Sequence, residues 1–202
     1  DAAAAPYREP GEREAAMGSW QRRPGSNALT WQRAGLHLEL WPAWLPTTPL
    51  SPDGLRRHLL TVIPWRQPEV TVFGRRHPVP RLTCWLGDPG CGYRYSGLLE
   101  TPHPWTPPLR QLRDLLEAHL GVEFNSLLLN RYRDGRDRMG WHADDERELA
   151  ANHPIASLSL GATRTLRFRP RAGRAASAAN PEPLAVELAD GDLLVMRAPT
   201  QS

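Results

Sequence analysis

The stretch that most constrains this chain runs from residue 130 to residue 146 and contains His142 and Asp144 two positions apart. In an extended strand successive side chains point to opposite faces, so residues i and i+2 share a face. An imidazole and a carboxylate would then lie side by side on one wall. Such a pair supplies two corners of the two-histidine, one-carboxylate triad that holds non-haem Fe(II). Because a lone His-x-Asp also occurs in polar turns, the surrounding residues must show whether this pair binds a metal.

Several separated motifs flank this pair in a fixed order. They are Asn130-x-Tyr132, Asp145-Glu146, the segment 154–162 and the segment 164–169. Their order resembles the AlkB family of Fe(II)- and 2-oxoglutarate-dependent dioxygenases, which remove alkyl groups from nucleic-acid bases by oxidation. The resemblance covers most of the chain, from about residue 38 to residue 201, and several motifs agree in both order and spacing.

The resemblance implies an iron site and a co-substrate site. His142 and Asp144 would bind Fe(II) and be catalytic. The residues of the strand before them, Leu128, Asn130 and Tyr132, share one face by period two. In the family the matching residues line the 2-oxoglutarate site. Taken alone, Asn130 could equally be a strand-edge amide bonded to backbone.

Phe73 is the first candidate contact to a substrate. Residues 70–80 predict a strand, a turn and a second strand, with Phe73 at the tip beside a glycine. Arg75, Arg76 and Arg81 flank the tip and could bind phosphates, while an apolar wedge can enter a base stack. The alternative is that Phe73 packs into the sheet. The tip resembles the intercalating hairpin of AlkB homologues that act on duplex DNA, which favours the functional interpretation.

Five further residues are candidate substrate contacts. The resemblance places Tyr93 and Tyr95 in the base pocket, although paired strand tyrosines are also common in half-buried sheets. Asp145 and Glu146 would favour a cationic base by charge, and they could instead cap the following turn. Arg164 would contact DNA or the pocket edge, or lie on a solvated strand face.

The expected fold is α+β and mainly β. Many short strands with turns and one or two helices indicate a double-stranded β-helix, or jelly roll, which the resemblance also implies. N-terminal helices and a nucleotide-recognition hairpin would complete it. The predicted parts are a disordered tail over 1–27, a dioxygenase domain over 28–202, a nucleotide-recognition region over 70–97 and a flexible loop over 171–183.

Individual elements can be placed from apolar periodicity. The predicted helices start near Ser51-Pro52-Asp53 and at Leu109, and they end at Pro64 and Gly121. A buried strand is expected from Phe124 to Tyr132. The Asp190-Gly191 dipeptide predicts a hairpin between strands within 184–196.

One expected motif is absent from the sequence. In the family a second histidine ligand follows a strand like 192–196, and arginines that bind 2-oxoglutarate come later. The sequence stops at Ser202, before that position. We therefore expect a domain that is incomplete at its C-terminus, with weak iron binding and poor turnover by residues 1–202 alone.

The composition limits the expected location of the protein and the partners it can bind. The hydrophobic fraction is 40%, and no apolar run approaches the length of a membrane span. Cys84 and Cys91 are expected to be ordinary reduced thiols. We expect a monomer that binds no membrane and is not secreted, located in the cytoplasm or, in a eukaryote, the nucleus. The net charge of +3 permits a DNA partner without demanding one.

The implied activity is DNA repair by oxidative demethylation of 1-methyladenine and 3-methylcytosine. It would use Fe(II), O2 and 2-oxoglutarate and release formaldehyde, succinate and CO2. Alkylated DNA, preferably duplex, would be the partner. Two alternatives remain at this point: a dioxygenase acting on RNA or protein, and a non-catalytic nucleic-acid-binding remnant.

Overall fold

The computed structural model describes residues 19–33, 35–91, 93–95, 98–144, 152–169 and 183–200, with the backbone alone for residues 72, 93–95 and 98–100. Strands outnumber helices in this part, which confirms the mainly β class. The helical elements are η2 (Leu45–Thr47), α1 (Pro52–Val62) and α2 (Pro107–Leu120). The strands are β1 (Gln21–Arg22), β2 (Leu29–Arg33), β3 (Leu36–Trp41), β4 (Glu69–Val72), β5 (Arg75–Pro78), β6 (Leu82–Gly87), β7 (Tyr93–Tyr95), β8 (Leu98–Glu100), β9 (Ser126–Arg131), β10 (Ile155–Leu158), β11 (Arg164–Phe168), β12 (Leu184–Leu188) and β13 (Leu193–Arg197).

The residues 28–202, predicted as one domain, divide into two compact units. The first unit combines the described residues up to Pro52 with those from Asp144 onward, and the second is Asp53–Ala143. None of the helices in the described residues has the length and apolar character that crossing a bilayer requires.

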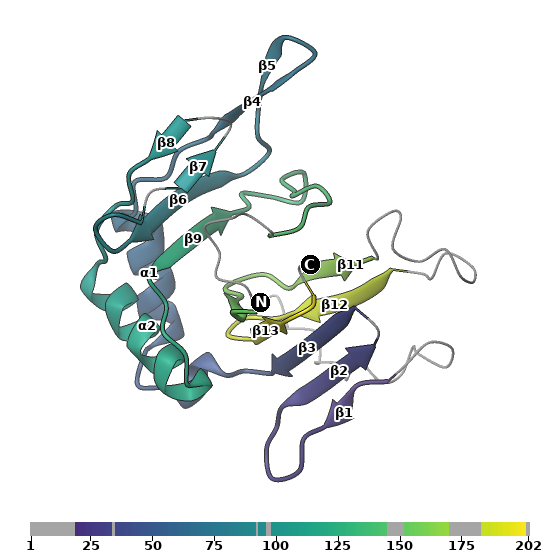
Figure 1. Cartoon of the computed structure of the whole chain (residues 1–202). Helices are drawn as coiled ribbons and strands as arrows, with labels where there is room; N and C mark the ends of the chain where they lie inside the picture. The colour runs from purple at the N-terminus through teal and green to yellow at the C-terminus, as the bar shows by residue number, and fades with distance from the viewer. Residues whose placement is uncertain are drawn as a thin grey trace, which may run out of the picture. The chain divides into compact units, whose positions relative to one another are not determined.

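The first unit is built from two antiparallel sheets that bury apolar side chains. One has the strand order β1-β2-β3-β13-β10, and the other pairs β11 with β12 (Figure 1). Alternation places pairs of apolar residues two positions apart in β2, β3, β12 and β13 on the core side. The buried cluster comprises Leu29, Trp31, Leu38, Leu40, Val186, Leu188, Leu194 and Met196. Leu166 and Phe168 of β11 pack against it.

The predicted tail over 1–27 is wrong for its last residues. Gln21 and Arg22 form β1 and pair with Thr30 and Leu29 of β2. Trp20 packs against the core cluster, and its ring centroid lies 5.8 Å from that of Trp31. These contacts explain why an apparently featureless stretch belongs to the fold. Residues 1–18 lie outside the described part of the chain.

The hairpin predicted at Asp190-Gly191 is also wrong. β12 pairs with β11, whereas β13 pairs with β3 and β10, so the turn carries the chain from one sheet to the other. Asp192 explains this crossing. Its buried carboxylate accepts hydrogen bonds from the backbone N–H groups of Ala43 and Ala189, both at 2.8 Å. The turn is thereby fastened to the chain after β3.

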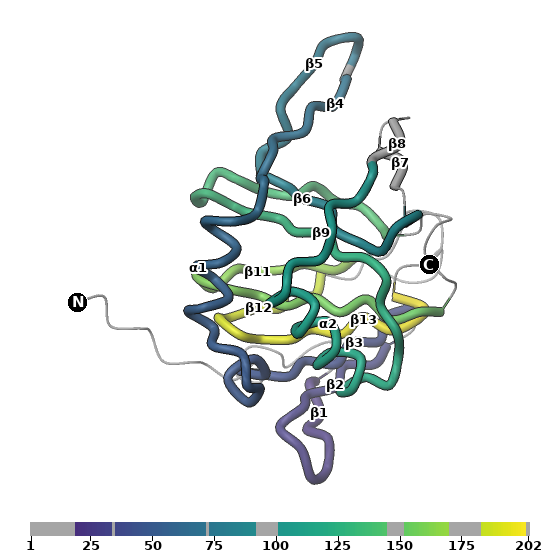
Figure 2. Tube along the Cα trace, turned by 90° about the vertical axis from the view of Figure 1, so that its left-hand side faces the viewer, coloured from purple at the N-terminus to yellow at the C-terminus, as the bar shows by residue number. Residues whose placement is uncertain are grey.

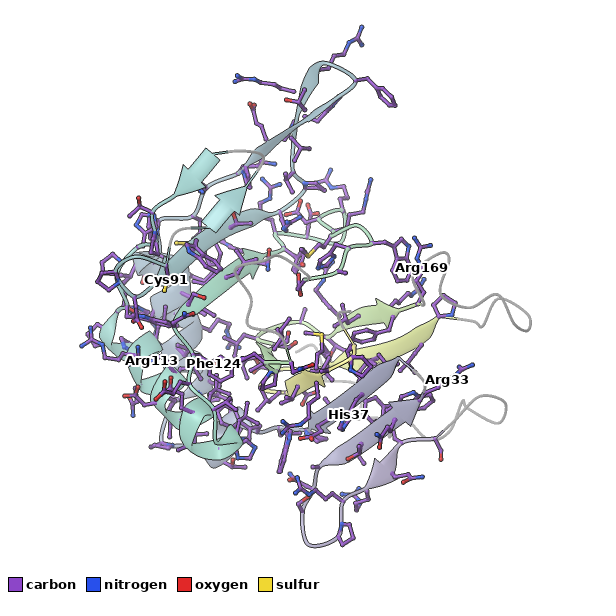
Figure 3. The ribbon with its side chains drawn as sticks, viewed as in Figure 1. Arg33, His37, Cys91, Arg113, Phe124 and Arg169 are labelled. Carbon is purple, nitrogen blue, oxygen red and sulfur yellow. The ribbon has the colours of Figure 1, made fainter. Side chains whose placement is uncertain are left out.

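The second unit contains both α-helices, which lie beside the β6–β9 pair (Figure 2). α1 and α2 confirm the predicted helices. α2 has proline in its first turn and ends at Gly121, whose φ of 70° is left-handed and suits glycine. Arg113 of α2 lies 5.1 Å from the centroid of the Trp105 ring, and Glu117 accepts a hydrogen bond from the Phe124 N–H at 2.7 Å (Figure 3).

Candidate functional site

The strand β9 and its partner β6 form one wall of the candidate site. The register places Asn130 opposite Thr83 and Leu128 opposite Trp85. By alternation Leu128 and Asn130 share a face of β9, whereas Tyr132 lies just beyond the end of the strand. The strand spans 126–131 rather than 124–132, and it is half-buried rather than buried. Leu128 is 41% exposed, so this face is open at one point and can meet a ligand.

Arg81 is the residue of this wall whose position most differs from expectation. It was predicted to be a phosphate-binding charge beside Phe73, yet it is 9% exposed. Its Nε donates a hydrogen bond to Oδ1 of Asn130 at 2.9 Å. Flanking arginines look alike in a sequence, because only tertiary packing decides which of them is buried. Arg81 is therefore a residue of the wall and not a surface charge.

A tight loop connects β9 to His142. Asp137 is 5% exposed, and it accepts hydrogen bonds from the backbone N, Nε and Nη2 of Arg133 at 2.9, 2.8 and 3.0 Å. This hydrogen bonding raises the pKa of Arg133 above its ordinary value. The backbone N–H of Arg138 donates to the carbonyl of Pro80 at 2.8 Å. The loop is thus fixed at several points, a role that sequence analysis did not assign to Asp137.

His142 follows this loop and is exposed. Its Nδ1 lies 2.9 Å from the Gly140 carbonyl oxygen. A carbonyl only accepts, so Nδ1 donates, and a neutral ring then carries its lone pair on Nε2. Within the described part of the chain residues 140–144 form no strand, so the shared face of His142 and Asp144 stays a prediction.

The donor atoms suit a non-haem iron ion. An imidazole with its lone pair on Nε2 and a carboxylate two residues later are nitrogen and oxygen ligands that Fe(II) accepts. The Nδ1 contact to a backbone carbonyl is the usual way of orienting a metal-binding histidine. Within the described ranges, no group of three or more potential ligands gathers in one place. His142 and Asp144 remain the predicted ligands of this chain.

The β4–β5 hairpin presents Phe73 to solvent. The register pairs Val72 with Arg75, so Phe73 and Gly74 form a two-residue turn. Their φ angles are 49° and 75°, as in the type I′ turns that favour Asn-Gly. The Phe73 side chain is fully exposed. The alternative that it packs into the sheet is therefore wrong.

The other candidate contacts are placed only in part. Tyr93 and Tyr95 lie on β7, which pairs with β8, and their side chains lie outside the described part. Asp145 and Glu146 lie outside the described residues altogether. Arg164 is exposed at the start of β11, opposite Leu188. Arg169 ends the described part of that segment (Figure 3).

Comparison of the sequence with known proteins agrees with these structural features. The pattern of the 2OG-Fe(II) oxygenase superfamily matches residues 37–202, and the chain belongs to this family. It is 46% identical over 134 residues to the DNA oxidative demethylase ALKBH2 of Bos taurus, covering 66% of this chain and 48% of that protein. It is 39% identical over 153 residues to the alpha-ketoglutarate-dependent dioxygenase alkB homolog 3 of Rattus norvegicus, covering 74% and 51%.

A plant relative extends this set. The chain is 36% identical over 169 residues to the DNA oxidative demethylase ALKBH2 of Arabidopsis thaliana, covering 74% of this chain and 52% of that protein. The AlkB resemblance is therefore confirmed. The chain spans about half the length of the curated relatives it matches.

Proposed function

We propose that the native protein is an oxidative demethylase of N-alkylated bases in DNA, with 1-methyladenine and 3-methylcytosine as substrates. The observation that carries this proposal is Phe73. A bulky residue at positive φ is unfavourable, and an exposed phenyl ring adds nothing to a core. Strained residues gather at functional sites. Membership of the oxygenase family supplies the chemical class, and Phe73 supports a nucleic-acid partner.

Phe73 suits a duplex more than a single strand. An apolar ring projecting from a narrow hairpin can enter a base stack and fill the gap left by an extruded nucleotide. Arg75 and Arg76 follow it on β5 and are exposed, so they can neutralise phosphates on either side. A methyl group on the Watson–Crick edge already prevents pairing, which lowers the cost of extrusion.

Each part of the site then has a role. His142 and Asp144 would hold Fe(II), while Leu128, Asn130 and Tyr132 would line the 2-oxoglutarate site. Bound iron with 2-oxoglutarate and O2 supplies the oxidation of the alkyl group, and formaldehyde, succinate and CO2 leave. Tyr93 and Tyr95 would stack on the base, and Arg164 would contact its strand. The residues would be carried by a jelly roll.

The negative side chains next to Asp144 would select the substrate by charge. 1-Methyladenine and 3-methylcytosine are cationic, and a carboxylate close to the base favours a cation over a neutral base. Asp145 and Glu146 are the candidates, with Glu146 accepting a hydrogen bond from the exocyclic amine. Their replacement by amides should narrow the preference for charged lesions over neutral ones.

The test uses the native full-length protein with Fe(II), 2-oxoglutarate and an oligonucleotide carrying 3-methylcytosine. We expect formaldehyde and succinate with duplex DNA, and neither with His142→Ala or Asp144→Ala. Methylated single-stranded DNA and RNA are the comparison substrates. Faster formaldehyde release with RNA would contradict DNA as the substrate. No formaldehyde release with any substrate would contradict the proposal that the protein is an enzyme.

The hairpin is tested separately. Phe73→Ala should weaken binding to duplex DNA and leave single-strand turnover nearly unchanged. His77→Ala is the matched control, because His77 is an exposed residue of the same hairpin. If the two substitutions weaken duplex binding equally, Phe73 does not act as a wedge. Duplex binding that depends on Phe73 but persists without any turnover would instead support a non-catalytic binding protein.

A further inference from the structure

Arg81 carries a buried positive charge that no carboxylate in the described part of the chain neutralises. A guanidinium is always charged, and a buried charge is costly unless it is paired and hydrogen-bonded. Arg81 is 9% exposed, and its hydrogen bond within the described part of the chain goes to the neutral amide of Asn130. No described carboxylate forms an ion pair with it. An arginine placed there for stability alone would ordinarily face an acidic residue.

The backbone around Arg81 is held firmly. Its N–H donates to the carbonyl of Val79 at 2.8 Å, and the N–H of Val79 donates to the carbonyl of Pro68 at 2.8 Å. The carbonyl of Pro80 accepts from Arg138 at 2.8 Å. Arg81 also precedes β6, whose register places Leu82 opposite Arg131. The direction in which its side chain leaves the backbone is therefore fixed.

The contact determines which way the Asn130 amide faces. Arginine has only donors, so the atom 2.9 Å from its Nε must be the amide oxygen. With the oxygen fixed on Arg81, the NH2 group points elsewhere and can only donate. Without Arg81 the amide could rotate and offer either end. A donor on this open strand face is complementary to an anionic oxygen, and a positive charge beside it strengthens that preference.

We propose that Arg81 is a positioning residue which orients the Asn130 amide so that its NH2 group donates to a carboxylate of the 2-oxoglutarate co-substrate. This inference rests on the proposed function, because Asn130 is there a co-substrate residue. Arg81 acts through Asn130 and also adds positive charge to the wall. It thereby favours a dianionic ligand over a neutral one of the same shape.

The first experiment needs no ligand. Asn130→Asp changes an NH2 group into an oxygen and adds a negative charge to the wall. Beside Arg81 the new carboxylate gains a charge-assisted hydrogen bond, so the variant should melt at the wild-type temperature or above. In an Arg81→Met background the same substitution should lower the melting temperature. A clear loss of stability in the presence of Arg81 would overturn the inference.

The second experiment observes the amide directly. In NMR spectra of the native full-length protein, the Asn130 side-chain NH2 signals should be separate and protected from exchange, and Asn130→Asp identifies them by their disappearance. Arg81→Met should shift them and speed their exchange. Arg131→Met is the matched control, since Arg131 is the next residue on β9 and points to the other face. Unchanged signals in folded Arg81→Met would overturn the inference.

The third experiment measures how Arg81 affects the binding of 2-oxoglutarate. Under anaerobic conditions, Arg81→Met should weaken 2-oxoglutarate binding to the Fe(II)-loaded protein about tenfold, the scale of one hydrogen bond to a charged group. Asn130→Asp should weaken it about a hundredfold, and Arg131→Met less than about twofold. Arg81→Met should raise KM for 2-oxoglutarate with little change in kcat. In a double variant with Asn130→Ala, losing Arg81 should add almost nothing.

The outcomes separate the two proposals. If the wild-type protein binds no 2-oxoglutarate, the proposed function fails, while the stability and NMR results still decide whether Arg81 orients Asn130. If the wild type binds and Arg81→Met binds equally well, the proposed function stands and the role of Arg81 is overturned.

Discussion

Among the described residues each of the two units buries one aspartate, and the two carboxylates are hydrogen-bonded differently. Asp192 of the first unit is 2% exposed and accepts hydrogen bonds from backbone N–H groups of Ala43 and Ala189. Asp137 of the second unit is 5% exposed and is bound by Arg133. The first carboxylate joins distant segments of a scaffold, whereas the second holds a local loop. The first unit adds such contacts to a large apolar core, whereas the loop before His142 is held mainly by oriented polar contacts.

The largest expected effect is in the scaffold. Leu194→Ala should lower the free energy of unfolding by about 3 kcal/mol, because it leaves a cavity in a core that cannot fully collapse. Leu194 is 0% exposed in the cluster between the two sheets. Urea unfolding followed by circular dichroism measures the change.

The control is a leucine of the candidate site. Leu128 is 41% exposed, so Leu128→Ala should cost less than about 1 kcal/mol. Similar losses for the two leucines would mean that the site wall carries as much of the stability as the core, and the contrast between the regions would be lost.

Asp192→Ala should have the next largest effect, a loss of about 2 kcal/mol in the free energy of unfolding. It leaves two backbone N–H groups without their acceptor, and unsatisfied buried donors are costly. Asp190→Ala is a matched control, because Asp190 lies in the same turn and binds the Gly161 N–H at an exposed position. Thermal melts of both variants should differ clearly; equal melts would show that water replaces Asp192.

Asp137→Asn should act locally. The substitution keeps the shape of the side chain and removes the charge that holds Arg133, so the loop opens more often. Hydrogen exchange of the Arg133 amide should become about tenfold faster, with a small change in global stability. Asp134→Asn, in the same loop and exposed, should leave that amide unchanged. A global loss of stability as large as that of Asp192→Ala would contradict the comparison.

The same contrast explains how far the sequence could be interpreted. Apolar periodicity places α1, α2 and most of β9 correctly, since burial depends on a repeat that the sequence displays, whereas β1, β2 and β8 were not predicted. Asp190-Gly191 misleads because the dipeptide encodes a turn and not the partners of the strands it joins. Those partners are fixed by Asp192 and by contacts with β3 and β10.

The candidate site also has features that the sequence predicts and features that it does not. Leu128 and Asn130 share a face of β9 because a strand alternates, which the sequence predicts, whereas Tyr132 lies one residue beyond the strand. The burial of Arg81 could not be predicted, since it depends on the turn at Val79 and Pro80. The sequence could not decide how His142 and Asp144 are presented because His-x-Asp fits a strand and a turn equally well, and the carbonyl of Gly140 is visible as a partner of His142 only in three dimensions.

The smallest expected effect is a titration on the loop surface. The side-chain hydrogen bond from Arg136 lowers the pKa of Asp134 below its ordinary value, and the backbone N–H of Arg136 adds to this. Since the folded-state pKa is the lower one, this contact stabilises the fold above the ordinary aspartate pKa, and the contribution disappears as the pH falls through the folded-state value. Because both groups meet solvent, salt should weaken it further. In an NMR titration, Arg136→Gln should raise the pKa of Asp134, whereas Arg138→Gln should not. Equal titration curves for the two variants would show that solvent screens the pair completely, and that the order of this loop comes from Asp137 alone.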